Sequence, residues 1–271
     1  MKSLSRNLLM GAVLAALPMS GALACTVTQW NGAKTAVDGD AQGPETAPVG
    51  ARYSGLCALN SASSASYVGD NHPVNDPEYT ARFYVYTGLT SGSAQVFGAY
   101  SADDGSGAVV DVTYDRDAGS FDFDANGASG SFAGVQPNRW YSIEIDYSAG
   151  TSFAAEVAGA GSDAIQAVTI SGTPGATNIE SARLGWIAGA GAGSIRTDEF
   201  ESTRGVAIGR LCRGDANADT NLNVFDRTVL TNEILGTSSA SGQPDMNEDG
   251  AVNVFDRTVL TNAILGAATC P

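Results

Sequence analysis

Two twelve-residue stretches of the sequence carry Asp and Asn at the same alternating positions. Residues 215–226 read DANADTNLNVFD, and residues 245–256 read DMNEDGAVNVFD. Short side chains with oxygen at positions 1, 3, 5 and 9, a carbonyl at position 7 and a carboxylate at position 12 supply the oxygens that Ca²⁺ prefers. We therefore predict two calcium sites. The predicted ligands are Asp215, Asn217, Asp219, Asn221 (carbonyl), Asn223 and Asp226 in the first loop, and Asp245, Asn247, Asp249, Ala251 (carbonyl), Asn253 and Asp256 in the second.

The two loops differ at position 6, where the chain must turn sharply. Gly250 stands there in the second loop, and glycine adopts a positive φ without strain. The first loop has Thr220, a β-branched residue for which a positive φ is costly. We therefore expect the second site to bind calcium more tightly than the first.

An amphipathic helix is predicted after each loop. Residues 223–236 read NVFDRTVLTNEILG and residues 253–266 read NVFDRTVLTNAILG, so the two copies differ only at Glu233 and Ala263. Apolar residues recur near helical spacing in both copies, which end at Gly236 and Gly266. No helical pattern of normal length precedes either loop, so each repeat consists of a loop and one exiting helix.

A loop followed by one helix, present twice, resembles the half-EF-hand arrangement of dockerins over residues 212–271. The resemblance implies calcium-dependent attachment to a cohesin-like protein. In cellulosomal dockerins, loop positions 10 and 11 are often Ser or Thr, whereas here they are Val224, Phe225, Val254 and Phe255. This departure argues against a cellulosomal cohesin. We predict that these four residues form a partner face, and the alternative is that both phenylalanines pack inside the module or against the rest of the chain.

Four cysteines allow two disulfides in a secreted protein, with three connectivities. Cys25 and Cys57 flank one segment, whereas Cys212 and Cys270 flank the calcium repeat. We therefore predict the pairs Cys25–Cys57 and Cys212–Cys270, the second of which clamps the ends of the repeat. Neither spacing is typical of a zinc site.

The N-terminal residues 1–24 have the pattern of a cleaved secretory signal. Lys2 and Arg6 give a basic start, an apolar run follows from Leu8 to Leu17, and Ala22-Leu23-Ala24 is a small-x-small site before Cys25. The run is too short to span a bilayer, and no other apolar stretch is long enough, so we predict no transmembrane segment. We expect a secreted protein, with association to the cell surface as an option. A lipidated Cys25 is the other interpretation, which Ala22 disfavours.

The charge of the chain restricts its partners. The formal net charge is −15, and removal of residues 1–24 makes the chain more acidic, because it takes away basic residues and no acid. Such a surface repels phosphate and anionic lipid, so nucleic acid is an unlikely partner class.

Short strand patterns separated by turns fill residues 25–205. Residues 140–147 alternate most clearly, with Tyr141, Ile143, Ile145 and Tyr147 on one face. The phrases at 138–157 (NRWYSIEIDYSAGTSFAAEV), 182–193 (ARLGWIAGAGAG) and 198–203 (DEFEST) resemble the concanavalin A-like lectin/glucanase (laminin-G-like) jelly roll. We expect a mainly β protein: an antiparallel jelly-roll β-sandwich followed by a small α-helical duplicated calcium-loop domain. The expected divisions are a signal peptide (1–24), the sandwich (25–205), a linker (206–211) and the dockerin-like domain (212–271).

The sequence offers weak support for catalysis. Family 16 glucanases, which share the jelly-roll fold, carry Glu-x-Asp-x-x-Glu on one strand, with the two glutamates as catalytic residues. This chain has Glu144 and Asp146, but Ala149 stands at the second glutamate. The single histidine, His72, has no evident catalytic partners, and the acidic residues 198–201 fit a charged strand end better than a metal site.

We therefore favour a non-catalytic, secreted, calcium-binding protein. Its sandwich would recognise a glycan or another extracellular polymer, and its dockerin-like module would attach it to a protein partner. One alternative is a divergent polysaccharide-degrading enzyme, either a hydrolase or a lyase, that carries a dockerin. A second alternative is a structural or adhesive surface protein in which the dockerin folds back onto the sandwich.

Overall fold

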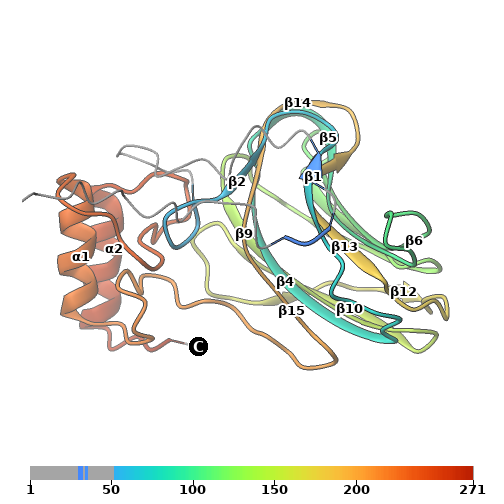
Figure 1. Ribbon diagram of the computed structural model, residues 1–271. Coiled ribbons are helices and arrows are strands. Elements are labelled where there is room, and N and C mark those ends of the chain that lie inside the picture. The colour runs from blue at the N-terminus through green and yellow to red at the C-terminus, as the bar shows by residue number, and fades with distance from the viewer. Residues whose placement is uncertain (1–29, 33, 36–51, 271) are drawn as a thin grey trace, which may run out of the picture.

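The computed structural model describes residues 30–32, 34–35 and 52–270, and shows a β-sandwich beside a small helical unit (Figure 1). The predicted signal segment and Cys25 lie outside the described residues. Among the described residues, no helix is both long and apolar enough to cross a membrane.

Two antiparallel sheets form the sandwich. Within the described residues, the first sheet has nine strands, in the spatial order β1 (Lys34–Thr35), β3 (Ser66–Asp70), β13 (Ser181–Ala188), β5 (Leu89–Tyr100), β6 (Ala108–Asp115), β7 (Ser120–Asp124), β8 (Ala128–Ala133) and β12 (Ser171–Gly172), with β14 (Gly191–Gly193) pairing with β5. The second has six, in the order β11 (Gln166–Ala167), β10 (Ser152–Gly159), β9 (Trp140–Ser148), β4 (Glu78–Tyr86), β15 (Ile195–Thr203) and β2 (Leu59–Ser61). Strands distant in sequence are neighbours in both sheets, which confirms the antiparallel jelly-roll sandwich.

The core of the sandwich lies between the two sheets. The four apolar residues that alternate along β9 are all buried in it, as their period of two predicts. Phe83 of β4 stacks on Phe97 of β5 with ring centroids 4.9 Å apart, so this pair joins the sheets through their centre.

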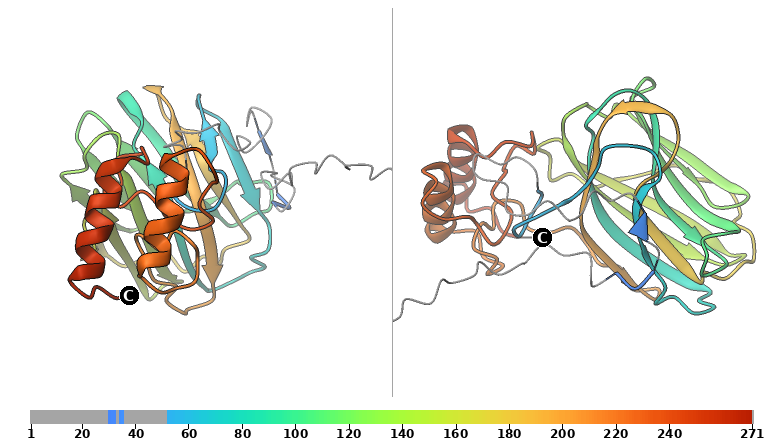
Figure 2. Two further views of the ribbon diagram at one scale, coloured as in Figure 1. Left: turned by 90° about the vertical axis from the view of Figure 1, so that its left-hand side faces the viewer. Right: turned by 45° about the horizontal axis from the view of Figure 1, so that its top comes forward.

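The helical unit consists of α1 (Val224–Ile234) and α2 (Val254–Leu265), each directly after one of the twelve-residue loops. Figure 2 shows the two helices side by side. Leu230 of α1 and Leu260 of α2 are fully buried in a small separate core, together with Met246 and Val252 of the second loop. So small an apolar core gives limited stability, and other contacts must add to it.

The buried face of each helix is narrower than the apolar stripe that the sequence predicts. Phe225, Leu235, Phe255 and Leu265 are exposed. The buried face of α1 is formed by Asp226, Leu230 and Glu233, at positions i, i+4 and i+7 of the helix. Phe225 precedes Asp226 by one residue and therefore points about 100° away from this face.

Candidate metal centre and the surfaces beside it

The first loop gathers three carboxylates. One oxygen each of Asp215, Asp219 and Asp226 lies within 4.8 Å of the others. Asp215 and Asp226 are buried and Asp219 is exposed. Three carboxylates around one point repel one another unless a cation lies between them, so this donor set fits a hard divalent ion such as Ca²⁺.

The second loop repeats the hydrogen bonds of the first at the carboxylate of position 1. The Asp219 and Thr220 amides donate to Asp215 over 3.0 and 2.7 Å. The matching amides of Asp249 and Gly250 donate to Asp245 over 3.2 and 2.7 Å. The backbone therefore holds the first ligand of each loop in the same orientation.

Position 6 has the left-handed backbone that the sequence predicts. Thr220 has φ 66° and Gly250 has φ 81°. Because the hydrogen bonds around them match, the first loop keeps its geometry, and the cost of Thr220 is backbone strain rather than distortion. The predicted difference in affinity between the loops stays a prediction.

Positions 9 and 12 of each loop also begin the following helix. The Asn223 side chain accepts a hydrogen bond from the Phe225 amide, and Asp226 accepts one from the Asn223 amide, both over 2.8 Å. Asn253, Phe255 and Asp256 repeat this capping box at the second helix. Since the oxygen of each position-9 Asn already caps its helix, it suits a contact to calcium through water, as this position often makes.

Burial disfavours the charged carboxylates of the second loop. Burial, followed by the neighbouring Asp256, raises the pKa of Asp245 to about 8. Burial also raises the pKa of Asp256 and, in the first loop, that of Asp226. A divalent cation among these groups would favour their charged forms, so calcium and protons should compete for both loops. Bound calcium would supply the positive charge that holds each loop closed.

The predicted partner face is exposed. Phe225 and Phe255 are 68% and 69% exposed, and Val224 and Val254 beside them are also exposed. The alternative, in which both phenylalanines pack inside the module or against the sandwich, is therefore wrong. Two large aromatic side chains in water at matching helix starts are typical of a surface that binds another molecule.

One of the two predicted disulfides lies within the described residues. Cys212 and Cys270 are bonded, with their Cα atoms 4.9 Å apart, so the two ends of the helical unit are clamped together. The Cys25–Cys57 pair includes a cysteine outside the described residues and stays a prediction.

The acidic candidates for catalysis have structural partners. Glu144 accepts hydrogen bonds from the amides of Ile208 and Gly209 over 3.0 and 2.8 Å, and so fixes residues 206–211 on β9. Asp146 accepts a hydrogen bond from Thr80. The exposed His72 pairs with Asp70. In the register, Glu156 of β10 lies opposite Glu144, and both line a hollow with Asp146.

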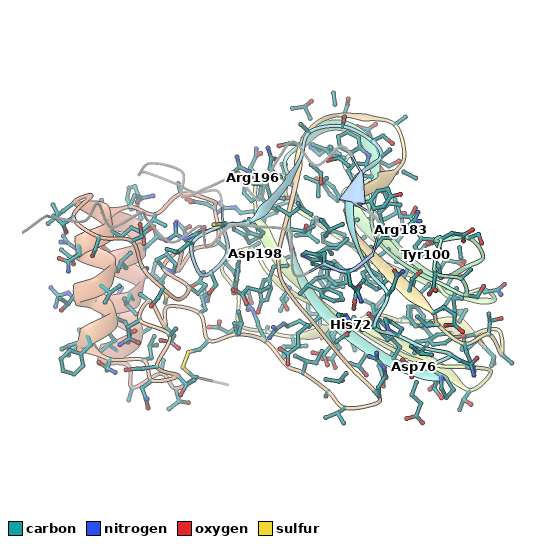
Figure 3. The ribbon with its side chains drawn as sticks, viewed as in Figure 1. His72, Asp76, Tyr100, Arg183, Arg196 and Asp198 are labelled. Atoms are coloured by element: carbon teal, nitrogen blue, oxygen red, sulfur yellow. A yellow bond between two sulfur atoms is a disulfide. The ribbon has the colours of Figure 1, made fainter. Side chains whose placement is uncertain are left out.

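Asp198 has a role that the sequence did not predict. It is half-buried and accepts hydrogen bonds from the amides of Tyr53 and Ser54 over 2.7 and 3.1 Å. Burial, and then the neighbouring Glu199, raises the pKa of Asp198 to about 8. Asp198 therefore anchors the segment of Tyr53 and Ser54, which approaches the helical unit. Figure 3 shows Asp198 on the side of the sandwich that faces the helices.

Two glutamates that the loop and strand patterns did not single out join the helical unit to the sandwich. Glu233 pairs with Arg52, and Glu248 pairs with Arg210. Both glutamates stand where the other repeat has alanine, at Ala263 and Ala218 respectively. Comparison of the two repeats position by position would have singled them out, because an acid present in only one copy serves something other than the shared calcium site.

The outer face of the nine-stranded sheet carries an aromatic and a basic group together. The Arg183 guanidinium lies 4.7 Å from the ring centre of Tyr67 and 5.0 Å from that of Tyr100. Figure 3 shows Arg183 and Tyr100 on the side of the sandwich away from the helices. Arginine held between two aromatic rings is a fixed planar group, and here it also donates to the Asp104 carbonyl.

A shallow polar hollow lies on the neighbouring strands of this sheet. Its volume is about 470 Å³. The side chains that line it come from β6, β7 and β8: Asp111, Thr113, Asp122, Phe123, Asp124, Ser129 and Ser131. Burial, and then the nearby Asp124, raises the pKa of Asp111 to about 6. In the register, Arg183 pairs with Gly98 and Gly98 pairs with Asp111, so the hollow continues the surface of the Arg183 stack.

Comparison with known proteins identifies the C-terminal unit. Residues 213–265 match the family model of the dockerin type I domain. No curated protein sequence matches the chain significantly.

Solved structures resemble the sandwich only distantly. One is the ligand-binding domain of botulinum neurotoxin serotype D in complex with N-acetylneuraminic acid, with 8% identity, a TM-score of 0.41, and coverage of 63% of this chain and 45% of that chain. Another is a Trypanosoma rangeli sialidase in complex with an inhibitor, with 13% identity, a TM-score of 0.39, and coverage of 56% and 26%. This chain spans less than half the length of either structure, and similarities this weak carry no conclusion about ligand or activity.

Proposed function

Since residues 213–265 are a dockerin type I domain, we propose that the protein is secreted and non-catalytic, and attaches to a cohesin-like protein when calcium is bound. Two occupied calcium loops would hold the helices in place, the second loop with the higher affinity. The sandwich would recognise an extracellular glycan or a similar polymer. The dockerin domain itself supports calcium-dependent protein attachment.

The observation that carries the attachment proposal is the exposure of Phe225 and Phe255. Both lie at the start of a helix whose capping box contains a predicted calcium ligand, Asp226 or Asp256. Calcium binding would therefore fix the backbone from which each phenylalanine projects. An apolar pair suits a partner with an apolar recess, in contrast to the hydroxyl-bearing pairs of cellulosomal dockerins.

A pull-down with the calcium-loaded protein tests the attachment. We expect a cohesin-like protein to be retained with calcium and released with EDTA. The double variant Phe225→Ala/Phe255→Ala should lose the partner, whereas Val74→Ala, which truncates an exposed apolar side chain on the sandwich, should keep it. Retention by the double variant would contradict the proposed face.

The outer face of the nine-stranded sheet is the proposed polymer-binding surface. Hydroxyl, carboxylate and guanidinium groups beside two tyrosine rings match the alternating polar and apolar surfaces of a sugar. The helical unit contacts the other sheet, through residues such as Tyr86 and Trp140, so it leaves this face uncovered (Figure 1).

Binding and turnover on one panel of polysaccharides test this surface. We expect binding without release of reducing sugar, and weaker binding by Tyr67→Ala and Asp122→Ala. Glu156→Gln changes an exposed acid of the opposite sheet and should bind normally. Release of reducing sugar would instead support the divergent enzyme.

The buried contacts between the dockerin and the sandwich favour a second candidate, a structural or adhesive surface protein whose dockerin folds back on its own chain. Arg52 with Glu233, and Arg210 with Glu248, are the contacts that favour it. Failure of the pull-down to retain any cohesin-like protein in calcium would support this candidate over attachment.

A further inference from the structure

Glu248, at position 4 of the second calcium loop, is completely buried against the sandwich. The Tyr53 hydroxyl donates to its carboxylate over 3.1 Å and the Gly161 amide over 2.8 Å. Arg210 forms an ion pair with the same carboxylate, and the Trp140 amide donates to the Glu248 backbone carbonyl over 2.9 Å. These four partners lie outside the helical unit, whereas the Glu248 amide donates to the Asp245 carbonyl within the loop over 3.3 Å.

The residues on either side of Glu248 also contact the sandwich and the segment that follows it. Arg139, next to the start of β9, donates to the carbonyl of Asn247 over 3.3 Å. Arg213 of the helical unit donates both to the carbonyl of Met246 over 2.6 Å and to that of Gly161 in the sandwich over 2.5 Å. Gly250 lies so close to Tyr86 that a Cβ atom at this position would come within 2.5 Å of the ring. The second loop is therefore held from residue 246 to residue 250.

Among the described residues, positions 4 to 6 of the first loop make no such contacts with the sandwich. Ala218 takes the place of Glu248, and Ala218, Asp219 and Thr220 are all exposed. Both position-4 residues have the same left-handed backbone, with φ 60° at Ala218 and 57° at Glu248. The two loops therefore have the same backbone conformation at position 4. They differ in the side chain there, because only that of Glu248 packs against the sandwich.

We propose that the second calcium loop is a latch, in which calcium binding and docking of the dockerin onto the sandwich stabilise each other through Glu248. Asn247 and Asp249 flank Glu248 and are predicted ligands, so an ion that fixes them also fixes the direction of the Glu248 side chain. By thermodynamic linkage, the factor by which bound calcium strengthens docking is also the factor by which the sandwich contacts raise the calcium affinity of this loop. Glu248 is a positioning residue here, because it acts on calcium through its neighbours. The inference rests on the calcium part of the proposed function and is independent of any cohesin partner or polymer.

The direction in which calcium affinity changes when Arg210 is removed distinguishes the latch from simple charge repulsion. A cation near a calcium site repels the ion, so its removal should strengthen calcium binding if only charge matters. The latch predicts the opposite, because loss of Arg210 leaves Glu248 buried without its ionic partner and favours the undocked loop.

Calorimetric calcium titration of the protein without residues 1–24 tests whether removal of Arg210 weakens or strengthens calcium binding. For Arg210→Met and for Tyr53→Phe, which removes only a hydroxyl, we expect one of two sites to weaken about five- to tenfold, within the usual range of coupling between sites. Arg204→Met is the matched control: it removes the same charge from the ion pair with Asp76, outside the contacts of the loop, and should leave both sites unchanged. Unchanged or tighter binding in Arg210→Met would overturn the latch.

Hydrogen exchange gives a readout that does not depend on affinity. The amides of Trp140 and Gly161 donate to Glu248, so both should lose protection when EDTA removes calcium, and should be unprotected in Glu248→Ala even with calcium. The amide of Ile145 in the middle of β9 should remain protected throughout, which also reports that the sandwich is folded. Full protection of Trp140 and Gly161 in EDTA would contradict the latch. A failed cohesin pull-down would affect neither result.

Discussion

Arg52 donates from one guanidinium nitrogen to both carboxylate oxygens of Glu233, each over 2.9 Å, although 181 positions separate the two residues. Each side chain is only 6% exposed, so the ion pair is shielded from water. Glu233 also accepts a hydrogen bond from the Ala240 amide over 2.6 Å. The pair joins the first dockerin helix to the segment that Asp198 anchors on β15.

Replacement of Glu233 by alanine makes the first helix identical to the second and leaves Arg52 buried without its partner. Because an unpaired buried charge is costly, we expect the variant to lose about 3 kcal/mol of the free energy that holds the helical unit in place. Urea unfolding followed by circular dichroism at the helical band measures this loss.

The double variant Arg52→Met/Glu233→Ala is the control for this pair. Removal of both charges should restore much of the lost stability, since no uncompensated charge remains. A single variant as stable as the unmodified protein would show that the ion pair contributes nothing to docking.

Thr220→Gly should strengthen the first calcium site. Glycine removes the strain of a β-branched residue at φ 66°, which is worth on the order of 1 kcal/mol, or about a fivefold gain in affinity. Calorimetry on the two-site protein measures the change, and Thr220→Ala, which keeps a Cβ atom, should gain less. A first site that already binds as tightly as the second would refute the predicted order.

Loss of the Cys212–Cys270 disulfide should make the helices dependent on calcium. The bond joins residues 58 positions apart, and chain-entropy estimates for such a loop give about 4 kcal/mol. In Cys212→Ser/Cys270→Ser we expect helical circular dichroism with calcium and its loss in EDTA. The variant leaves the other cysteines untouched, which reductant would not. An unchanged spectrum in EDTA would show that the small apolar core suffices.

Asp111 should make the sandwich less stable as pH rises. Its folded pKa of about 6 lies above the ordinary 3.8, so the folded protein holds this proton more strongly than the unfolded chain does. The resulting stabilisation is complete below about pH 4 and is lost as pH rises to about 6. Asp111→Asn should remove this decline, because a neutral amide still accepts from Gln95.

Urea unfolding of the sandwich at several pH values measures the Asp111 effect. The exposed acid Asp103, changed to asparagine, is the control, and should follow the unmodified protein. Parallel curves for Asp111→Asn and the unmodified protein would exclude the assigned contribution.

The features that the sequence predicted are those encoded by nearby residues. The twelve-residue loops, their exiting helices and the alternation of β9 each follow from spacings of a few positions. The partners of Asp198, Glu233 and Glu248 lie on segments that are distant in the chain, so no local pattern contains them. The exposure of Phe225 could have been deduced from its helical position relative to Asp226, once the carboxylate was taken to point inward to the metal.

The near identity of α1 and α2 has a geometric consequence for any complex. A partner that grips one helix face could grip the other after a half-turn of the dockerin, since both present the same residues. In the part of the chain that the structure describes, only the second loop is covered by the sandwich, so the two poses are not equivalent: each would send the sandwich in a different direction from the partner's surface. A partner large enough to contact the sandwich could bind in only one of the two orientations. The repeat that carries Glu248 would then determine how the whole protein is oriented on that partner.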